Sequence, residues 1–194
     1  MTRKADFELV SKNLKDYIAF HNEKSLLIEG DSKTILKNFP NNSVSLILTD
    51  PPYHTTKKKN IYGDTSFEKD NEYLQWLSEL SQEWLRILRP NGTLFLFCSS
   101  AMAARIEVML SKSFNILSNI VWTKPNDPGF DGWKQKMKKE SLRQWYAHTE
   151  RIIFAEPASE GNLKKSSFAN FLREMRKQAQ LRAHQLTELT GAYG

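Results

Sequence analysis

Two stretches of the chain carry hydrophobic residues at the three- and four-residue spacing of an amphipathic helix. The first comprises Phe7, Val10, Leu14, Tyr17 and Ile18. The second comprises Tyr73, Leu77, Leu80, Trp84 and Leu88, and Pro90-Asn91-Gly92 should end it. Shorter helices are predicted over residues 32–39, with Ser32 as the cap, and over residues 101–110.

Short apolar runs between these helices predict strands. They lie at residues 25–31, 44–49, 93–98, 116–123 and in the centre of 148–157. The run 93–98 is apolar at almost every position, which predicts a strand buried on both faces within a parallel sheet. Strands that alternate with helices indicate an α/β protein.

The end of the chain has a different pattern. Residues 158–194 show no strand signal and predict one helix near 168–180 and a second from about 183 to 189. We therefore divide the chain into residues 1–157, which hold the sheet, and a helical region, residues 158–194. The two helices resemble the start of a helix-turn-helix of the phage-repressor type, with Leu172 and Met175 in its core. Two amphipathic helices that pack on the body are the alternative.

The composition excludes several classes of protein. Apolar residues make up 40% of the chain and charged residues 26%, as in ordinary globular proteins. No run approaches the ~18 apolar residues of a membrane span, and the first ten residues lack the apolar core of a signal peptide. A single cysteine, Cys98, allows neither an intrachain disulfide nor a cysteine zinc cluster. These features predict a cytoplasmic protein.

Basic residues are concentrated at one end of the chain. The net charge is +6, yet residues 1–131 hold 16 basic and 16 acidic residues. Residues 132–194 hold 12 basic and 6 acidic residues. The excess suggests that the second part handles a polyanion, with an ordinary solvated surface as the alternative.

The tetrapeptide Asp50-Pro51-Pro52-Tyr53 follows the apolar run 44–49 without a spacer. Ligands of open α/β sheets bind at the carboxyl ends of strands, so a site is expected here. A turn that only ends the strand, with Tyr53 packed beneath it, is the alternative.

This motif and its surroundings resemble the S-adenosylmethionine-dependent amino-methyltransferases of DNA. The resemblance runs to residue 157 and is carried by IEGD (28–31), LILTDPPY (46–53), LRPNGTLFLF (88–97), IVWTKP (120–125) and HTERIIFAEP (148–157). It implies a Rossmann-like methyltransferase sheet and methyl transfer to an amino nitrogen of double-stranded DNA. Asp at the first motif position favours N6 of adenine. An N4-cytosine or RNA amino-methyltransferase and an inactive DNA-binding remnant are the alternatives.

The chemistry of amino methylation accounts for the motif. The lone pair of an adenine amino nitrogen is delocalised into the ring, so that nitrogen is a poor nucleophile. The Asp50 carboxylate and the Pro51 carbonyl are each expected to accept one N6–H bond and so free the lone pair. Pro51 and Pro52 have no N–H that would compete. Tyr53 offers a ring on which an extruded base can stack. No covalent nucleophile is needed, and Cys98 is expected to be a core thiol.

The resemblance also assigns binding residues. Asp31 and Asp50 are the expected cofactor-binding residues, since the family places an acidic residue like Asp31 by the adenosyl group. Asp31 as a helix cap is the alternative. Glu150 is expected to be structural or hydrogen-bonding.

A basic run follows the motif. Lys57, Lys58 and Lys59 are expected to contact DNA phosphates, or else to form a solvated loop. The histidines lack metal-ligand spacing, so no metal site is expected.

One element of the family is missing from the sequence. The eight glycines include no G-x-G, although the family has a glycine-rich loop for the cofactor. The resemblance therefore suggests the N-terminal part of a longer enzyme, whose remainder carries that loop and two strands between those that end at Asp31 and Asp50. On this interpretation the chain alone is inactive, exposes a sheet edge, and needs a complementary half or a second copy as a partner.

Overall fold

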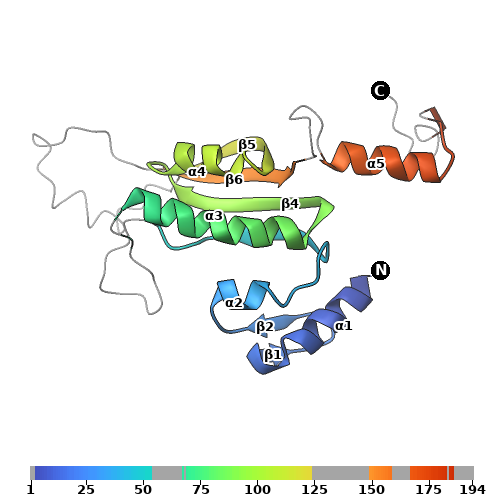
Figure 1. Ribbon diagram of the computed structural model, residues 1–194, viewed down its shortest axis with the longest axis horizontal. Helices are drawn as coiled ribbons and strands as arrows, with labels where there is room; N and C mark the ends of the chain where they lie inside the picture. The colour runs from blue at the N-terminus through green and yellow to red at the C-terminus, as the bar shows by residue number, and fades with distance from the viewer. Residues whose placement is uncertain are drawn as a thin grey trace, which may run out of the picture.

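The computed structural model describes residues 3–53, 67, 69–123, 149–158, 167–182 and 184–185. Their helices and strands follow in chain order (Figure 1): α1 (Arg3–Asn13), the 3-10 helix η1 (Lys15–Tyr17), β1 (Ile18–His21), β2 (Leu26–Ile28), α2 (Ser32–Leu36), β3 (Val44–Thr49), α3 (Asp70–Ile87), β4 (Leu88–Ser99), α4 (Ala103–Leu110), β5 (Phe114–Thr123), β6 (Thr149–Pro157) and α5 (Ser167–Gln178). No helix in these ranges is long and apolar enough to cross a membrane.

The larger sheet has four strands in the order β3-β4-β6-β5. β3 and β4 run parallel, whereas β6 is antiparallel to both of its neighbours. The predicted α/β class is confirmed, but the sheet is mixed rather than parallel. The sequence showed the apolar runs and gave no information on the direction of β6.

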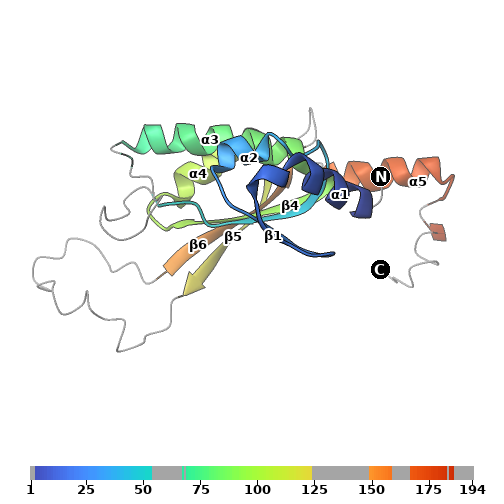
Figure 2. The ribbon, with the colours of Figure 1, turned by 90° about the horizontal axis from the view of Figure 1, so that it is seen from below.

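Helices cover one face of this sheet. α3 and α4 lie side by side on that face (Figure 2), and their buried residues form one core with Leu94, Leu96 and Cys98 of β4. The intervening Phe95 and Phe97 are only partly buried. The prediction that residues 93–98 are buried on both faces is therefore wrong, because no helix in the described ranges packs against the second face.

The N-terminal elements form a separate small unit. β1 pairs antiparallel with β2, so that Ile18 lies opposite Ile28, and this two-stranded sheet is not hydrogen-bonded to the larger one. α1 packs on it through a second apolar cluster of Val10, Leu14 and Ile35. The helix predicted to continue to Ile18 ends at Asn13, because Ile18 begins a strand.

The expected gap between the two sheets is present. A cleft of about 360 Å³ separates them, lined by Val10, Leu26 and Ile28 on one side and by Val44 and Ser45 of β3 on the other. β3 is an edge strand of the larger sheet, and Leu46 and Leu48 are 54% and 65% exposed. The predicted exposed sheet edge is confirmed for the residues that the structure describes.

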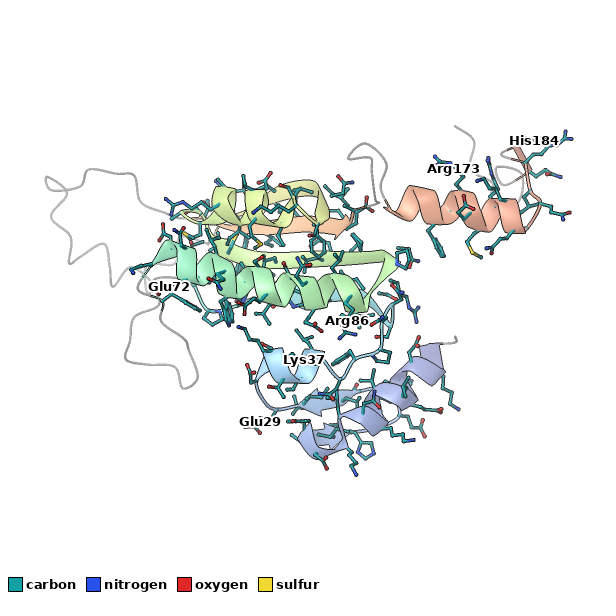
Figure 3. All side chains as sticks on the ribbon, viewed as in Figure 1. Glu29, Lys37, Glu72, Arg86, Arg173 and His184 are labelled. Atoms are coloured by element: carbon teal, nitrogen blue, oxygen red, sulfur yellow. The ribbon has the colours of Figure 1, made fainter. Side chains whose placement is uncertain are left out.

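Arginine side chains connect the small unit to the larger sheet. Arg86, at the end of α3 (Figure 3), donates from Nη1 to the Phe39 carbonyl at 2.7 Å and from Nη2 to the Leu36 carbonyl at 2.8 Å. Arg89 forms an ion pair with the buried Asp6 of α1. These contacts fix where the segment between α2 and β3 lies.

Two element boundaries differ from the prediction. α3 ends at Ile87, and Leu88 already belongs to β4, so Pro90-Asn91-Gly92 lies within a strand instead of ending a helix. Gly92 packs so closely on Leu88 that an added Cβ would lie 2.9 Å from Leu88 Cδ2. The helix predicted near residues 168–180 is present as α5. Leu172 and Met175 on this helix are 49% and 48% exposed, so they form no packed core, and residues 186–194 lie outside the described ranges.

Candidate active site

The motif Asp50-Pro51-Pro52-Tyr53 lies directly after the last residue of β3, Thr49. Pro51 is buried, Pro52 and Tyr53 are half-buried, and Asp50 is exposed. The two prolines fix φ and have no N–H, so they donate no backbone hydrogen bond within the motif. The motif therefore presents a carboxylate and an aromatic ring at the carboxyl end of a strand.

Tyr53 is bound to a residue far away in the sequence. Its Oη donates a hydrogen bond to Glu150 Oε2 of β6 at 3.0 Å. Burial raises the pKa of the phenol well above its ordinary value, and the carboxylates of Glu150 and Asp50 raise it further. The phenol therefore stays protonated and acts as a donor in the neutral pH range.

Asp31 occupies the corresponding end of β2. Gly30, with φ of 152°, lets the chain turn between the strand and α2. Asp31 then caps α2, and its Oδ2 accepts hydrogen bonds from the Thr34 backbone N at 3.2 Å and from Thr34 Oγ1 at 3.1 Å. The helix cap that was the alternative for Asp31 is therefore confirmed, whereas Ser32, the other predicted cap, is the first helical residue.

A cavity of about 370 Å³ joins these two strand ends. It is lined by Gly30, Asp31, Ser32, Thr49, Asp50, Pro51, Pro52, Trp76, Leu80 and Trp84. The fold thus brings Asp31 and Asp50 to one cavity from different sheets. Its size lies within the range of ligand sites, about 300–1,000 Å³. Two carboxylates facing an aromatic wall suit a ligand that is both cationic and planar.

Sequence reasoning missed Trp76 as a cavity residue, and it expected Glu150 to be structural or hydrogen-bonding without identifying Tyr53 as its partner. Trp76 lines the cavity together with Leu80 and Trp84, all at four-residue steps along α3. Leu80 and Trp84 belong to the apolar stripe that was predicted with Tyr73 and Leu77, and Trp76 lies four residues before Leu80, so the spacing could have indicated it. Trp76 also packs on Phe67, with ring centroids 5.3 Å apart. Glu150 carried no local signal of contact with Tyr53, because strand pairing alone brings them together.

Other predicted residues lie elsewhere. Lys57, Lys58 and Lys59 fall outside the described residues. Cys98 is fully buried, and burial raises the pKa of its thiol to about 12, so it is the core thiol that was predicted. Within the described ranges, no group of three or more histidine, cysteine or acidic side chains is arranged to hold a metal.

Comparison with known proteins gives a family match. The model of the DNA methylase family (N6_N4_Mtase) matches residues 44–188, well over half of the chain. DNA adenine methyltransferase YhdJ of Escherichia coli K12 is 36% identical over 104 residues, which are 54% of this chain and 35% of that protein. Type II methyltransferase M.BglII of Bacillus subtilis is 28% identical over 142 residues, 68% of this chain and 38% of that protein. The chain thus spans less than two fifths of these curated relatives.

A solved structure gives the fold. The PvuII DNA methyltransferase, described as cytosine-N4-specific, superposes with a TM-score of 0.51 at 18% identity, over 66% of this chain and 48% of that one. At this identity the likeness concerns the fold alone. It confirms that the four-stranded sheet with its helices is part of a Rossmann-like methyltransferase fold.

Proposed function

The chain belongs to the DNA methylase family, and from this premise we propose that it carries the catalytic part of a site-specific DNA methyltransferase. The reaction is transfer of a methyl group from S-adenosylmethionine to the N6 amino group of adenine. One observation carries the proposal: Asp50, at the end of β3, shares a single cavity with Asp31 and with the tryptophans of α3.

Asp50 and Pro51 supply the acceptors for the amine. The exposed carboxylate of Asp50 accepts one N6–H, and the Pro51 carbonyl accepts the other. These hydrogen bonds draw the nitrogen towards tetrahedral geometry and localise its lone pair. A hydrogen bond to a charged acceptor is roughly twice as strong as a neutral one, which favours the carboxylate as the main contributor.

Tyr53 receives the target base. A base inside a duplex is out of reach of a pocket, so it must be extruded at a cost of a few kcal/mol. Stacking on an aromatic ring is worth about 1–3 kcal/mol per base and offsets part of that cost. The half-buried ring of Tyr53, next to Asp50, is the surface that the motif offers for this contact.

The cavity fits the cofactor by its chemistry. S-adenosylmethionine, when bound, supplies an activated methyl group on a sulfonium. Asp31 would accept hydrogen bonds from the adenosyl group, because only Oδ2 of its carboxylate is engaged in the cap among the described residues. Trp76 and Trp84 present apolar aromatic surface to a planar group, and Asp50 brings a negative charge near a cationic one.

Adenine is favoured over cytosine. The relative at 36% identity is named a DNA adenine methyltransferase, whereas the cytosine-N4-specific structure supports the fold only. Asp at the first motif position points in the same direction. Oligonucleotides in which each base is replaced in turn by its N-methylated form would identify the acceptor. Loss of tritium incorporation with N4-methylcytosine but not with N6-methyladenine would overturn the adenine assignment.

Double-stranded DNA is the proposed polymer substrate. Lys57, Lys58 and Lys59 follow the motif by four residues, and α5 adds the exposed Arg173 and Lys177, of which Lys177 pairs with Glu174 at 2.8 Å. Each phosphate contact contributes about 0.9 to the slope of log affinity against log salt. Replacement of the three lysines by alanine should flatten that slope. An unchanged slope would assign them to a solvated loop, and preferential methylation of RNA duplexes would overturn DNA as the substrate.

The activity requires a further polypeptide part. β3 is an edge strand, a cleft separates it from β2, and one face of the larger sheet is apolar and uncovered by the described helices. We propose that a complementary C-terminal part, or a second copy of the chain, completes the sheet and the cofactor site. Titration calorimetry with S-adenosylmethionine tests this directly, since the chain should bind it only together with the complementary part. No binding in either state would favour an inactive DNA-binding remnant.

A further inference from the structure

We propose that Glu150 is a positioning residue, which holds the phenol of Tyr53 and thereby fixes the ring against which the extruded base stacks. The inference rests on the proposed function, in which the Tyr53 ring receives the base. It adds a residue outside the motif to the base-binding site.

Glu150 is held on a rigid support. It is the second residue of β6, the strand that pairs on both sides, and it lies opposite Ser99 of β4 and Trp122 of β5. Tyr53 lies beyond the end of β3, so strand pairing does not hold it. A side chain outside a strand is free to rotate about χ1 and χ2 unless another group holds its tip. The 3.0 Å hydrogen bond from Tyr53 Oη to Glu150 Oε2 provides that restraint.

The direction of the bond has a chemical consequence. The phenol has one proton to donate, and Asp50 is also close enough to interact with it. A phenol that turned to Asp50 would compete with the target amine for the carboxylate. Glu150 accepts the phenol proton at 3.0 Å from the sheet side and so provides an acceptor for that proton in addition to Asp50.

Preorganisation makes this restraint useful for binding. Ordering a free side chain at the moment of binding lowers the affinity, and a ring already held in place avoids that loss. Glu150 should therefore affect how well a base stacks, and this effect should depend on the Tyr53 hydroxyl.

The test uses the full 194-residue chain and a single-stranded oligonucleotide that carries one 2-aminopurine, a fluorescent adenine analogue. Stacking of this base on an aromatic ring quenches its fluorescence, and a single strand requires no knowledge of the target sequence. In Glu150→Ala the ring must be ordered when the base binds, which should raise the dissociation constant by up to about tenfold. Glu150→Gln should retain part of the effect, because its amide oxygen can still accept the phenol proton.

Two variants make the result specific. Tyr53→Phe should weaken binding by a similar factor, and the double variant Tyr53→Phe/Glu150→Ala should be no worse than either single one. Glu156→Gln is the matched control, since Glu156 lies on the same strand, is buried and accepts a 2.9 Å hydrogen bond from Asn115 Nδ2. Circular dichroism and melting confirm that each variant is folded.

The outcomes separate the two proposals. If the original chain quenches the probe and Glu150→Ala quenches it equally well, the positioning role is overturned while the base site stands. Effects of Tyr53→Phe and Glu150→Ala that add together would also overturn it. No quenching by the original chain would refute the base site itself, and the positioning role with it.

Discussion

The two faces of the four-stranded sheet are made by the same strands and have opposite surroundings. On one face, Leu94 and Leu96 of β4 are completely buried beneath α3 and α4. On the other, Leu48 of β3 is 65% exposed, and Phe95 stacks on Phe154 with ring centroids 4.6 Å apart. We call these the covered face and the open face.

The difference shows which face of the sheet the described helices stabilise and which face is open to a binding partner. The open face carries apolar residues such as Leu46, Leu48 and Phe95, yet α3 and α4 both lie on the covered face (Figure 2). Large exposed apolar patches on a folded protein mark interaction surfaces. The covered face thus supplies the stability of the chain, and the open face together with the edge strand β3 is where the proposed complementary part would bind.

Methyl transfer is the measurement with the largest expected effect. The isolated chain should incorporate no tritium from labelled S-adenosylmethionine into unmethylated bacterial DNA, because a half-built pocket cannot hold donor and amine in line within about 3–3.5 Å. Adding the complementary part should restore incorporation. Leu48→Asp on the open face should abolish this rescue, since it places a charge in the proposed interface.

The control for this experiment is a substitution at an exposed residue of α1. Glu8→Gln, at an exposed position of α1 far from the open face, should leave the rescue intact. Robust incorporation by the chain alone would mean that it holds the cofactor by itself. The open face would then have no role in catalysis.

Replacing one leucine on each face by alanine should show that the covered face contributes more to the free energy of unfolding than the open face does. Leu96→Ala removes a fully buried side chain and should cost about 2–5 kcal/mol of unfolding free energy. Leu48→Ala, on the neighbouring strand, should change it by no more than about 0.5 kcal/mol. Urea unfolding followed by circular dichroism measures both, and equal losses would show that the open face is covered in solution.

The sequence predicted the covered face better than the open one. Helical spacing located α3 and α4, and the apolar runs located β3, β4 and β5, because these patterns are local. Pairing partners are not local, so β1 was missed and the antiparallel direction of β6 was not foreseen. An all-apolar strand such as β4 also cannot show which of its faces a helix will cover.

The candidate site shows the same contrast between local patterns, which the sequence reveals, and long-range contacts, which it does not. Asp50 and Asp31 were found from local motifs, and the fold places both at one cavity. Glu150 was missed as a partner of Tyr53 because their contact spans 97 residues and depends on the position of β6. Local sequence thus predicted the proposed reactive groups, whereas the contact proposed to orient one of them required the fold.

Loss of the catalytic carboxylate should have a smaller effect than loss of the complementary part. In the complemented protein, Asp50→Ala removes a charge-assisted hydrogen bond made in the transition state. By analogy with an oxyanion-hole donor, it should cost about 2–4 kcal/mol, or roughly 10²- to 10³-fold in rate. DNA affinity, measured by fluorescence anisotropy, should stay within about twofold, because Asp50 contacts the amine and not the duplex. Near-normal turnover of Asp50→Ala would refute the assignment of Asp50 to the catalytic site.

The smallest effect, on thiol reactivity, gives the sharpest contrast between the faces. Burial on the covered face raises the pKa of the Cys98 thiol from 9.0 to about 12, so at pH 8 it is protonated and enclosed. Because the folded-state pKa is the higher one, the thiol favours the folded state below pH 9, and this contribution is lost as the pH rises towards 12. At pH 8, Ellman's reagent should therefore modify Cys98 only as fast as the chain unfolds. A cysteine placed on the open face by Leu48→Cys should react within the mixing time, and its reaction should slow when the complementary part binds. Rapid modification of Cys98 in the folded chain would show that α3 and α4 do not seal the covered face.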